Sequence, residues 1–261
     1  MTIGKYLLYQ VAEENIGIIT LNQPENYNLV GSALWEEMYE VQDLIERDKS
    51  LRVVIINANG DHFSAGVNLK ELRGIDSQFI MDRLVWLQRL YSRWQEWGIP
   101  VIAAVHGLTY GSAMELILGC DIRIAADNTR MSIPEVRFGL TPDMGGTTRL
   151  THLVGVGQAK RLLMACDEID AEEALRMGLV EVVVPKDELM PRAMKMAKRI
   201  ASMPPAAVAF AKKGVNVANE SSVAASLLFE QAQSTFCCGT EDQNEAIDAF
   251  FEKRKPVFHR K

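Results

Sequence analysis

Two short, uninterrupted apolar runs constrain the fold of this chain most strongly. Residues 53–56 read Val-Val-Ile-Ile, and residues 101–105 read Val-Ile-Ala-Ala-Val. Such runs are typical of strands that are covered on both faces, as in parallel sheets. Residues 81–97 lie between the two runs and carry apolar side chains at helical spacing, namely Leu84, Leu87, Tyr91 and Trp94. This order of strand, helix and strand favours the α/β class.

The flanking segments fit the same class. Residues 6–11 and 16–21 have the β-branched and aromatic residues of a hairpin, and residues 32–48 have an amphipathic helical pattern. Residues 121–125 predict a further strand. The aromatic side chains of the helix over 81–97 are expected to be core residues, since a helical stripe of apolar side chains is usually buried.

Helical patterns dominate the last hundred residues. Asp170 and Glu173 have the spacing of a capping box, and a strand is expected over residues 180–184. Four helices are predicted after it, over residues 189–201, 205–217, 221–236 and 241–253. The clearest break between them is Pro204 followed by Pro205. We therefore place a domain boundary near residue 200, with a core over residues 1–200 and a helical region over residues 201–261.

Composition narrows the classes of partner. Of the 261 residues, 48% are hydrophobic and 24% charged, and the formal net charge is −6, so no positive excess is available for a nucleic-acid backbone. The longest apolar stretches fall far short of the roughly 20 residues that span a bilayer, so no membrane partner is expected. Four cysteines without metal-ligand spacing, and no signal peptide before them, predict a cytoplasmic protein.

Several familiar motifs are absent or incomplete. Residues 155–160 begin like a dinucleotide-binding fingerprint, but they lack its third glycine and do not follow a leading strand. The sequence has neither a phosphate-binding P-loop nor the G-x-S-x-G turn of serine hydrolases. Its four histidines are too scattered to predict a zinc site, and no metal is expected.

Two glycine-containing turns follow predicted strands. Residues 61–70 come directly after the first apolar strand, and residues 105–116 link the second to an apolar helix that starts near Ser112. A helix start leaves backbone N–H groups without partners. If two such turns lie at adjacent strand ends, two backbone amides can donate to one oxygen and stabilise an oxyanion. From the residues alone, the alternative that both are merely tight turns stays open.

Three carboxylates accompany these turns. Glu115 lies about one turn into the predicted helix, on an apolar face where an unpaired carboxylate is costly to bury. Glu135 follows 20 residues later, and Asp143 eight residues after that. Paired acids of this kind suit general acid and base catalysis. Each acid alone also fits a helix cap or a surface carboxylate.

At these residues the sequence resembles the crotonase (enoyl-CoA hydratase/isomerase) superfamily. The matching motifs occur in the family's order over essentially the whole chain. They are Pro-Glu-Asn-Tyr-Asn at residues 24–28, Phe-Ser-Ala-Gly-Val-Asn-Leu-Lys-Glu-Leu at 63–72, and the segments 107–116, 134–147 and 249–255.

The resemblance implies a crotonase-like spiral of β-β-α units and a C-terminal helical oligomerisation region that makes homotrimers or homohexamers. It implies an acyl-CoA thioester substrate, so that coenzyme A enters as part of the substrate and no separate cofactor is expected. Backbone N–H groups of Val67 and Ser112 are then expected to bind the thioester oxygen. Glu115 and Glu135 match the catalytic glutamates of the hydratases, and Asp143 matches an acid that some isomerases use.

The resemblance also implies a set of residues that contact coenzyme A or the acyl group. Lys70 and Lys253 suit the phosphates of coenzyme A, and Lys253 is expected to come from a neighbouring region or subunit. The other expected contacts are Ala65, Gly66, Asn68, Leu69 and Gly111.

Five positions depart from the family's common pattern. Asn68 stands where an aspartate is common, and Tyr27 where a basic residue is usual. Ser112 and Ala113 replace two glycines. Asp143 replaces a glycine that is typical of ordinary hydratases, and a third carboxylate near two others raises at least one pKa by repulsion.

The leading hypothesis is an enoyl-CoA hydratase, a hydro-lyase that adds water across the double bond of a 2-enoyl-CoA through a stabilised enolate. In it, Glu115 deprotonates the water and Glu135 delivers a proton to Cα. The alternative is a double-bond isomerase of an enoyl-CoA or dienoyl-CoA that shuttles a proton between Asp143 and Glu135. A third reading is a non-catalytic acyl-CoA-binding scaffold.

Overall fold

The structure is a computed structural model that describes residues 4–259. A six-stranded sheet forms its centre, and all neighbouring strands are parallel except the first two, which form an antiparallel hairpin. In spatial order the strands are β1 (Leu7–Ala12), β2 (Ile16–Leu21), β3 (Val53–Ala58), β4 (Val101–Val105), β6 (Ile122–Ala126) and β9 (Val182–Val184). The two apolar runs are thus the middle strands β3 and β4, as predicted.

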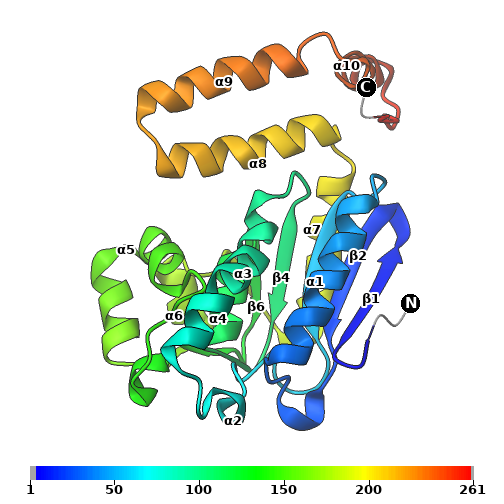
Figure 1. Cartoon of the computed structure of the whole chain (residues 1–261). Helices are drawn as coiled ribbons and strands as arrows, with labels where there is room; N and C mark the ends of the chain where they lie inside the picture. Colours follow the sequence, from blue (N-terminus) through cyan, green and yellow to red (C-terminus); the bar gives the residue numbers. More distant parts are fainter. Residues whose placement is uncertain (1–3, 260–261) are drawn as a thin grey trace.

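Helices cover both faces of this sheet, which explains the uninterrupted apolar runs (Figure 1). Val54 and Ile56 of β3 belong to one core cluster, and Val53 and Ile55 to the other. On the second face the sheet packs against α7 (Leu189–Ala201). The first face is covered by α1 (Ser32–Arg47), α3 (Ser77–Glu96), α4 (Ser112–Leu118), α5 (Gly146–Met164) and α6 (Ala171–Arg176).

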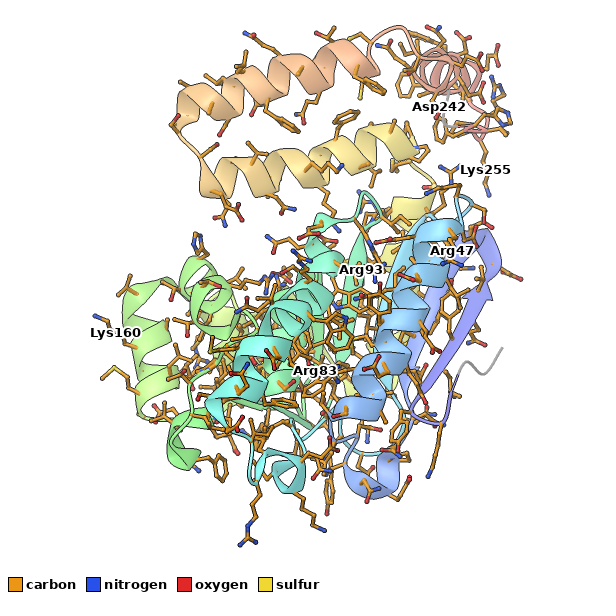
Figure 2. The ribbon with its side chains drawn as sticks, viewed as in Figure 1. Arg47, Arg83, Arg93, Lys160, Asp242 and Lys255 are labelled. Atoms are coloured by element: carbon orange, nitrogen blue, oxygen red, sulfur yellow. The ribbon has the colours of Figure 1, made fainter. Side chains whose placement is uncertain are left out.

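The two long helices of the first face, α1 and α3, are tied together by charge as well as by packing. Arg93 of α3, labelled in Figure 2, binds Asp43 at 2.7 Å and Glu46 at 2.9 Å on α1. The same pair of helices buries Trp35 of α1 and, as expected for the aromatic side chains of α3, Tyr91 and Trp94, whereas Trp86 is only half-buried.

A second, smaller sheet positions the loops at one end of the main sheet. Its strands are β5 (Leu108–Tyr110), β7 (Arg130–Ser132) and β8 (Ile169–Asp170), with β5 and β7 parallel. The short helices of the chain are α2 (Leu69–Leu72), η1 (Glu13–Asn15), η2 (Pro24–Asn26), η3 (Glu135–Phe138) and η4 (Lys186–Glu188). Two strands followed by a helix recur along the chain, as β1-β2-α1, β4-β5-α4 and β6-β7-α5.

The C-terminal helices extend from the core. They are α8 (Pro205–Glu220), α9 (Val223–Cys237) and α10 (Glu241–Glu252), and Figure 1 shows α8 and α9 lying side by side, away from the sheet. Lys212 anchors α8, because its buried ammonium group binds the Asp121 carboxylate at 2.7 Å and the Trp94 carbonyl at 2.6 Å. The division expected near residue 200 falls between α7 and α8, and as a domain boundary it stays a prediction.

Several element bounds differ from those expected. Helix α3 begins at Ser77 rather than at residue 81, because the Asp76 side chain accepts a hydrogen bond from the Phe79 amide and caps the helix. Gly155 interrupts α5 with a φ of 77°. Residues 155–160, which begin like a dinucleotide-binding fingerprint, therefore belong to a broken helix. The capping box predicted at Asp170 and Glu173 is confirmed in part, since the Asp170 side chain accepts a hydrogen bond from the Glu173 amide at 2.8 Å.

No helix within residues 4–259 is long and apolar enough to cross a membrane. The same residues contain no group of three or more His, Cys, Asp or Glu side chains arranged to hold a metal ion.

Candidate active site

The segment around Val67 is held on both sides by backbone hydrogen bonds that leave one amide free. Ser64 pairs with β5 through two bonds of 2.9 and 3.0 Å. On the other side, Val30 donates to the Gly66 carbonyl at 2.8 Å, and Asn68 donates to the Val30 carbonyl at 2.7 Å. Between these bonds, the Val67 amide has no hydrogen-bond partner within residues 4–259. It is therefore available to a ligand.

A second free amide lies at the start of α4. Gly111 adopts a φ of 52°, which favours glycine, and its own N–H donates to Ser132 of β7 at 2.9 Å. The chain then enters α4, where the amide of Ser112 is one of the first N–H groups and has no partner among the described residues. Val67 and Gly111 line the same cavity, and Ser112 directly follows Gly111 in the chain.

This cavity, which we call the Glu135 cavity, has a volume of about 500 Å³. It lies between residues 65–72, the end of β5 and the short helix η3. Apolar side chains of Leu29, Leu72, Phe138 and Leu140 form much of its wall. The expected contact residues that line it are Ala65, Gly66, Asn68, Leu69, Lys70 and Gly111.

Glu135 reaches the cavity because β7 runs parallel to β5. Tyr110 and Ser132 are register partners, so Gly111 and Glu135, which follow shortly after them, come together. A Cβ atom on Gly111 would lie 2.7 Å from Glu135 Oε1, so only glycine fits there without displacing the carboxylate. Glu135 Oε2 is buried without a hydrogen-bond partner among the described residues. This burial raises the pKa of Glu135, and repulsion from Asp143 raises it further.

Glu115 is almost fully buried, at 1% exposure. Its Oε1 accepts hydrogen bonds from the Met144 amide at 2.8 Å and the Gly146 amide at 2.9 Å. Burial raises the pKa of Glu115 to about 8 despite these two bonds, and the charges of Glu135 and Asp143 act in the same direction. A carboxyl group with such a pKa is suited to exchange a proton near neutral pH.

Arg149 supports the loop that holds Glu115. Its guanidinium donates to the Met144 carbonyl at 3.0 Å, the Gln95 side chain at 2.9 Å and the Ser92 hydroxyl at 2.8 Å. The Met144 peptide thus links the two charges, since its N–H bonds Glu115 and its carbonyl bonds Arg149. Burial lowers the pKa of Arg149. Of the influences that raise this pKa, the negative charge of Glu115 is the largest.

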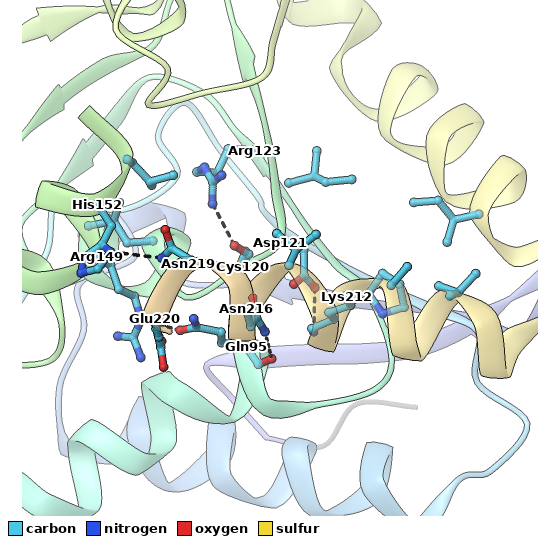
Figure 3. A pocket seen from close by; sticks show the side chains of 18 of the residues that line it. Gln95, Cys120, Asp121, Arg123, Arg149, His152, Lys212, Asn216, Asn219 and Glu220 are labelled. Carbon is cyan, nitrogen blue, oxygen red and sulfur yellow. Dashed lines mark hydrogen bonds and ion pairs between the residues drawn. The ribbon is translucent and has the colours of Figure 1, made fainter. Parts of the chain in front are cut away.

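Arg149 also lines a second cavity of about 690 Å³, on the side toward α8 (Figure 3). Several charged groups there are already paired or hydrogen-bonded, as Asp121 is with Lys212. Although this cavity is the larger one, it lacks Glu115, Glu135 and both free amides among its lining residues. Of these two cavities, only the Glu135 cavity is lined by Glu135 and by Val67, whose amide is free.

We expect Arg149→Met to move the acid limb of the pH profile of kcat/KM to higher pH. Removing the cation makes the charged form of Glu115 less favourable, so the pKa of Glu115 rises and a larger fraction is protonated at neutral pH. Arg149→Lys keeps the charge and is the matched control, with an expected smaller shift. A profile unchanged in Arg149→Met, measured from pH 6 to 9.5, would contradict this coupling.

Asp143 is near both glutamates but lines a different cavity. It is half-buried, and burial raises its pKa. Its charge raises the pKa of Glu115 and that of Glu135. Its own cavity, about 380 Å³, lies toward Gln88 and Ser92 of α3. Asp143 is thus electrically coupled to the site without lining the Glu135 cavity.

Within one chain, Lys253 does not join the other expected contacts. It caps α10 and is exposed, and it is absent from the residues that line the Glu135 cavity. Figure 1 shows α10 at the opposite end of the molecule from α2, which lines that cavity. Asn68 has a further role, because its side chain accepts a hydrogen bond from the Lys70 amide and caps α2.

Arg149 was not found by the sequence reasoning. Its contacts join α3, α5 and the loop before α5, so they depend on tertiary structure. A sequence signal did exist: Gly145 adopts a φ of 109°, and a Cβ there would lie 1.9 Å from Arg149 Nη1. The consecutive glycines Gly145 and Gly146 thus leave room for the arginine and for Glu115.

Comparisons with known proteins agree with this geometry. The family model described as Enoyl-CoA hydratase/isomerase matches residues 11–261. The short-chain-enoyl-CoA hydratase of Clostridium acetobutylicum is 38% identical, over 93% of this chain and 94% of that protein. The crotonyl-CoA hydratase of Syntrophomonas wolfei is 35% identical, over 94% and 95%. The crystal structure of an enoyl-CoA hydratase from Bacillus anthracis has a TM-score of 0.94 at 33% identity and covers 98% of this chain and 100% of its own.

Proposed function

Because the chain belongs to the enoyl-CoA hydratase/isomerase family and has the crotonase fold, we propose that it is a hydro-lyase that adds water to a 2-enoyl-CoA thioester. The observation that carries the proposal is the Glu135 cavity, which is lined by Glu135 and by Val67 with its free amide, and by Gly111, which directly precedes the free amide of Ser112. Burial raises the pKa of Glu135 and that of Glu115, and the charge of Glu135 acts on Glu115. The hydratases of known name, at 35 to 38% identity, support the substrate class.

The two amides bind the thioester oxygen in this proposal. Hydrogen bonds from Val67 and Ser112 strengthen as negative charge moves to that oxygen, so they stabilise the enolate-like transition state more than the substrate. No side chain has to rearrange, because both N–H groups are fixed by the backbone bonds around them. The double bond is polarised, and Cβ becomes electrophilic.

The glutamates move two protons. The oxygen of a water molecule attacks Cβ while its proton passes to the Glu115 carboxylate, and Cα takes the proton of the Glu135 carboxyl group. One C–O bond and one C–H bond form, and the π bond between Cα and Cβ is lost. Every atom comes from water and the two carboxyl groups, so we propose that no metal or redox cofactor takes part.

The coenzyme A portion is proposed to lie along residues 65–70. Lys70 is exposed at the cavity rim and carries the charge that suits a phosphate. Ala65, Gly66, Leu69 and Gly111 bring backbone and apolar surface close to the ligand. Lys253 is proposed to contact coenzyme A from a neighbouring subunit, because its own chain holds it far from the cavity.

We propose a homotrimer or a homohexamer. The C-terminal helices expose many large apolar side chains, which an interface is expected to cover. They are Val215, Val223, Leu227, Leu228, Phe236, Phe250 and Phe251. Light scattering is expected to give the mass of three or six chains, and a monomer at micromolar concentration would contradict the proposal.

The remaining partner and compartment proposals follow from charge and cysteine chemistry. The net charge of −6 argues against a nucleic-acid partner, and no membrane partner is proposed. The four cysteines are free, with Cys120 and Cys166 buried, which suits a reducing cytoplasm.

The isomerase is the second candidate function, and a specific observation favours it. The charge of Asp143 raises the pKa of Glu135, so the two acids are coupled as a proton shuttle between them requires. Against it, Asp143 lines another cavity, and the isomerase gives Glu115 no task. The third reading, a silent acyl-CoA-binding scaffold, leaves the raised pKa values of both glutamates without a use.

A panel of enoyl-CoA thioesters tests the proposal. Loss of the absorbance of the conjugated thioester is expected with at least one unsaturated chain, and it reports hydration directly. Acyl length, branching or a ring is then read from the ratio of kcat/KM values. Binding of coenzyme A without turnover of any member would favour the silent scaffold.

A further inference from the structure

Three buried side chains from three helices form a hydrogen-bonded chain that ends at the start of α4. Trp35 of α1 donates its indole N–H to the Tyr91 hydroxyl of α3 at 3.2 Å. The Tyr91 hydroxyl lies 2.6 Å from the Ser112 hydroxyl. The exposed fractions are 7%, 0% and 2%, so water does not replace these bonds.

The chemistry of the groups fixes the direction of the first bond, and in the second bond either hydroxyl can be the donor. An indole N–H only donates, so the Tyr91 oxygen accepts from Trp35. The phenol then has one proton to give, and the Ser112 oxygen is within reach of it. Charge in the vicinity comes from Glu115 and Asp143, which both act on Tyr91. Removing one hydroxyl would leave the remaining polar atoms buried without partners.

Ser112 is the residue whose free amide is proposed to bind the thioester oxygen. Its side chain and that amide share one Cα atom, so a contact that fixes the side chain also restrains the direction of the N–H. Helix α4 has only seven residues, and its preceding residue is the left-handed Gly111. Backbone bonds from Gly111 to Ser132 and from Glu115 to Gly111 hold this turn, and the hydroxyl contact adds a restraint on Ser112 itself.

We propose that Tyr91 is a positioning residue for the reaction, which holds the amide of Ser112 in the direction of the thioester oxygen, with Trp35 orienting the Tyr91 hydroxyl. This inference rests on the proposed function. Tyr91 and Trp35 are absent from the lining of the Glu135 cavity, whereas Gly111, the residue before Ser112, lines it. The two aromatic side chains are therefore inferred to act through Ser112 rather than on the substrate. The tyrosine is therefore more than a core residue, because its hydroxyl has a task that phenylalanine lacks.

A double-mutant cycle separates positioning from simple packing. Tyr91→Phe keeps the ring and is expected to lower kcat about tenfold with KM within about twofold, since a displaced oxyanion donor loses transition-state stabilisation. Ser112→Gly keeps the amide and removes the hydroxyl contact, and it is expected to lower kcat similarly. In the Ser112→Gly background, Tyr91→Phe is expected to change kcat by less than about twofold, because the contact is already gone.

Tyr9→Phe is the matched control. Tyr9 is a buried tyrosine of β1 whose hydroxyl has no hydrogen-bond partner among the described residues, and it is remote from α4 in sequence and sheet position. The Tyr9→Phe variant is expected to have an unchanged kcat. If Tyr91→Phe fails to fold, Ser112→Ala takes its place in the comparison with wild type.

A spectroscopic readout keeps this test distinct from that of the proposed function. An aryl-conjugated enoyl-CoA bound to the protein is expected to show a red-shifted absorption band, because hydrogen bonds to its carbonyl polarise it. The red shift is expected to decrease to the same extent in Tyr91→Phe and in Ser112→Gly. This absorption measurement does not require turnover. Equal losses from Tyr91→Phe in both backgrounds, or an unaltered band in Tyr91→Phe, would overturn the proposal even in an active hydratase. Absence of turnover with the expected band changes would instead overturn only the proposed function.

Discussion

Glu135→Gln is expected to lower kcat by about a hundredfold or more, because a positioned general acid contributes roughly 10² to 10⁴ to the rate. Glutamine has the shape of the acid but no proton to deliver to Cα. The substitution also leaves the space beside Gly111 filled, so the cavity keeps its form. KM is expected to change little, since Glu135 acts in the transition state.

Glu115→Gln is expected to lower kcat by a factor of the same order. A glutamine oxygen still accepts from the amides of Met144 and Gly146, so the loop is retained while the base is lost. Asp143→Asn is the contrasting variant and is expected to hydrate within roughly tenfold of wild type, because neither proton transfer uses that carboxylate. Steady-state kinetics with a shared enoyl-CoA substrate measure all three. Near-normal turnover in Glu135→Gln would refute the roles assigned to the glutamates.

Lys212→Met is expected to destabilise the protein by about 3–5 kcal/mol, the range for breaking a buried ion pair by removing one partner. The change leaves the Asp121 carboxylate without its cation, and the carbonyls of Trp94 and Ile99 lose their donor. Burial already raises the pKa of Asp121 and lowers that of Lys212, which shows that both charges are expensive to desolvate here. Helix α8 is expected to loosen first.

Chemical denaturation at one fixed protein concentration measures this effect, because association also contributes to apparent stability. The double variant Asp121→Leu with Lys212→Met removes both charges and is expected to be more stable than Lys212→Met alone. Lys213→Met, beside it on the same helix and exposed, is the control and is expected to change stability by less than about 0.5 kcal/mol. Additive losses in the double variant would contradict a coupled pair.

The longer elements were predictable because their patterns reflect burial directly. Strands β3 and β4 are apolar throughout because helices cover both faces, and α7 was predicted with the bounds it has. The start of α3 was missed because the apolar stripe begins later than the Asp76 cap. Strands β5 and β7, with three residues each, are too short to show a period, although they bring Gly111 to Glu135.

The candidate site likewise has parts that the sequence predicts and parts that depend on the tertiary structure. The glycine turns and the acids Glu115 and Glu135 stand in motifs that the sequence displays. The structure places Glu135, Val67 and Gly111 on one cavity and buries Glu115 where the charge of Glu135 raises its pKa. The supports from Arg149 and Tyr91 join residues distant in the sequence, so no local pattern marks them. Lys253 is a further case, since the fold of a single chain keeps it away from the cavity.

The mass of the product in isotopically labelled water tests the central claim most directly. The protein, a 2-enoyl-CoA and water enriched in ¹⁸O are incubated, and the thioester is analysed by mass spectrometry. The account predicts a 3-hydroxyacyl-CoA that has gained one water with the heavy oxygen on Cβ. A product of unchanged mass with a moved double bond would contradict it and would assign the reaction to the isomerase.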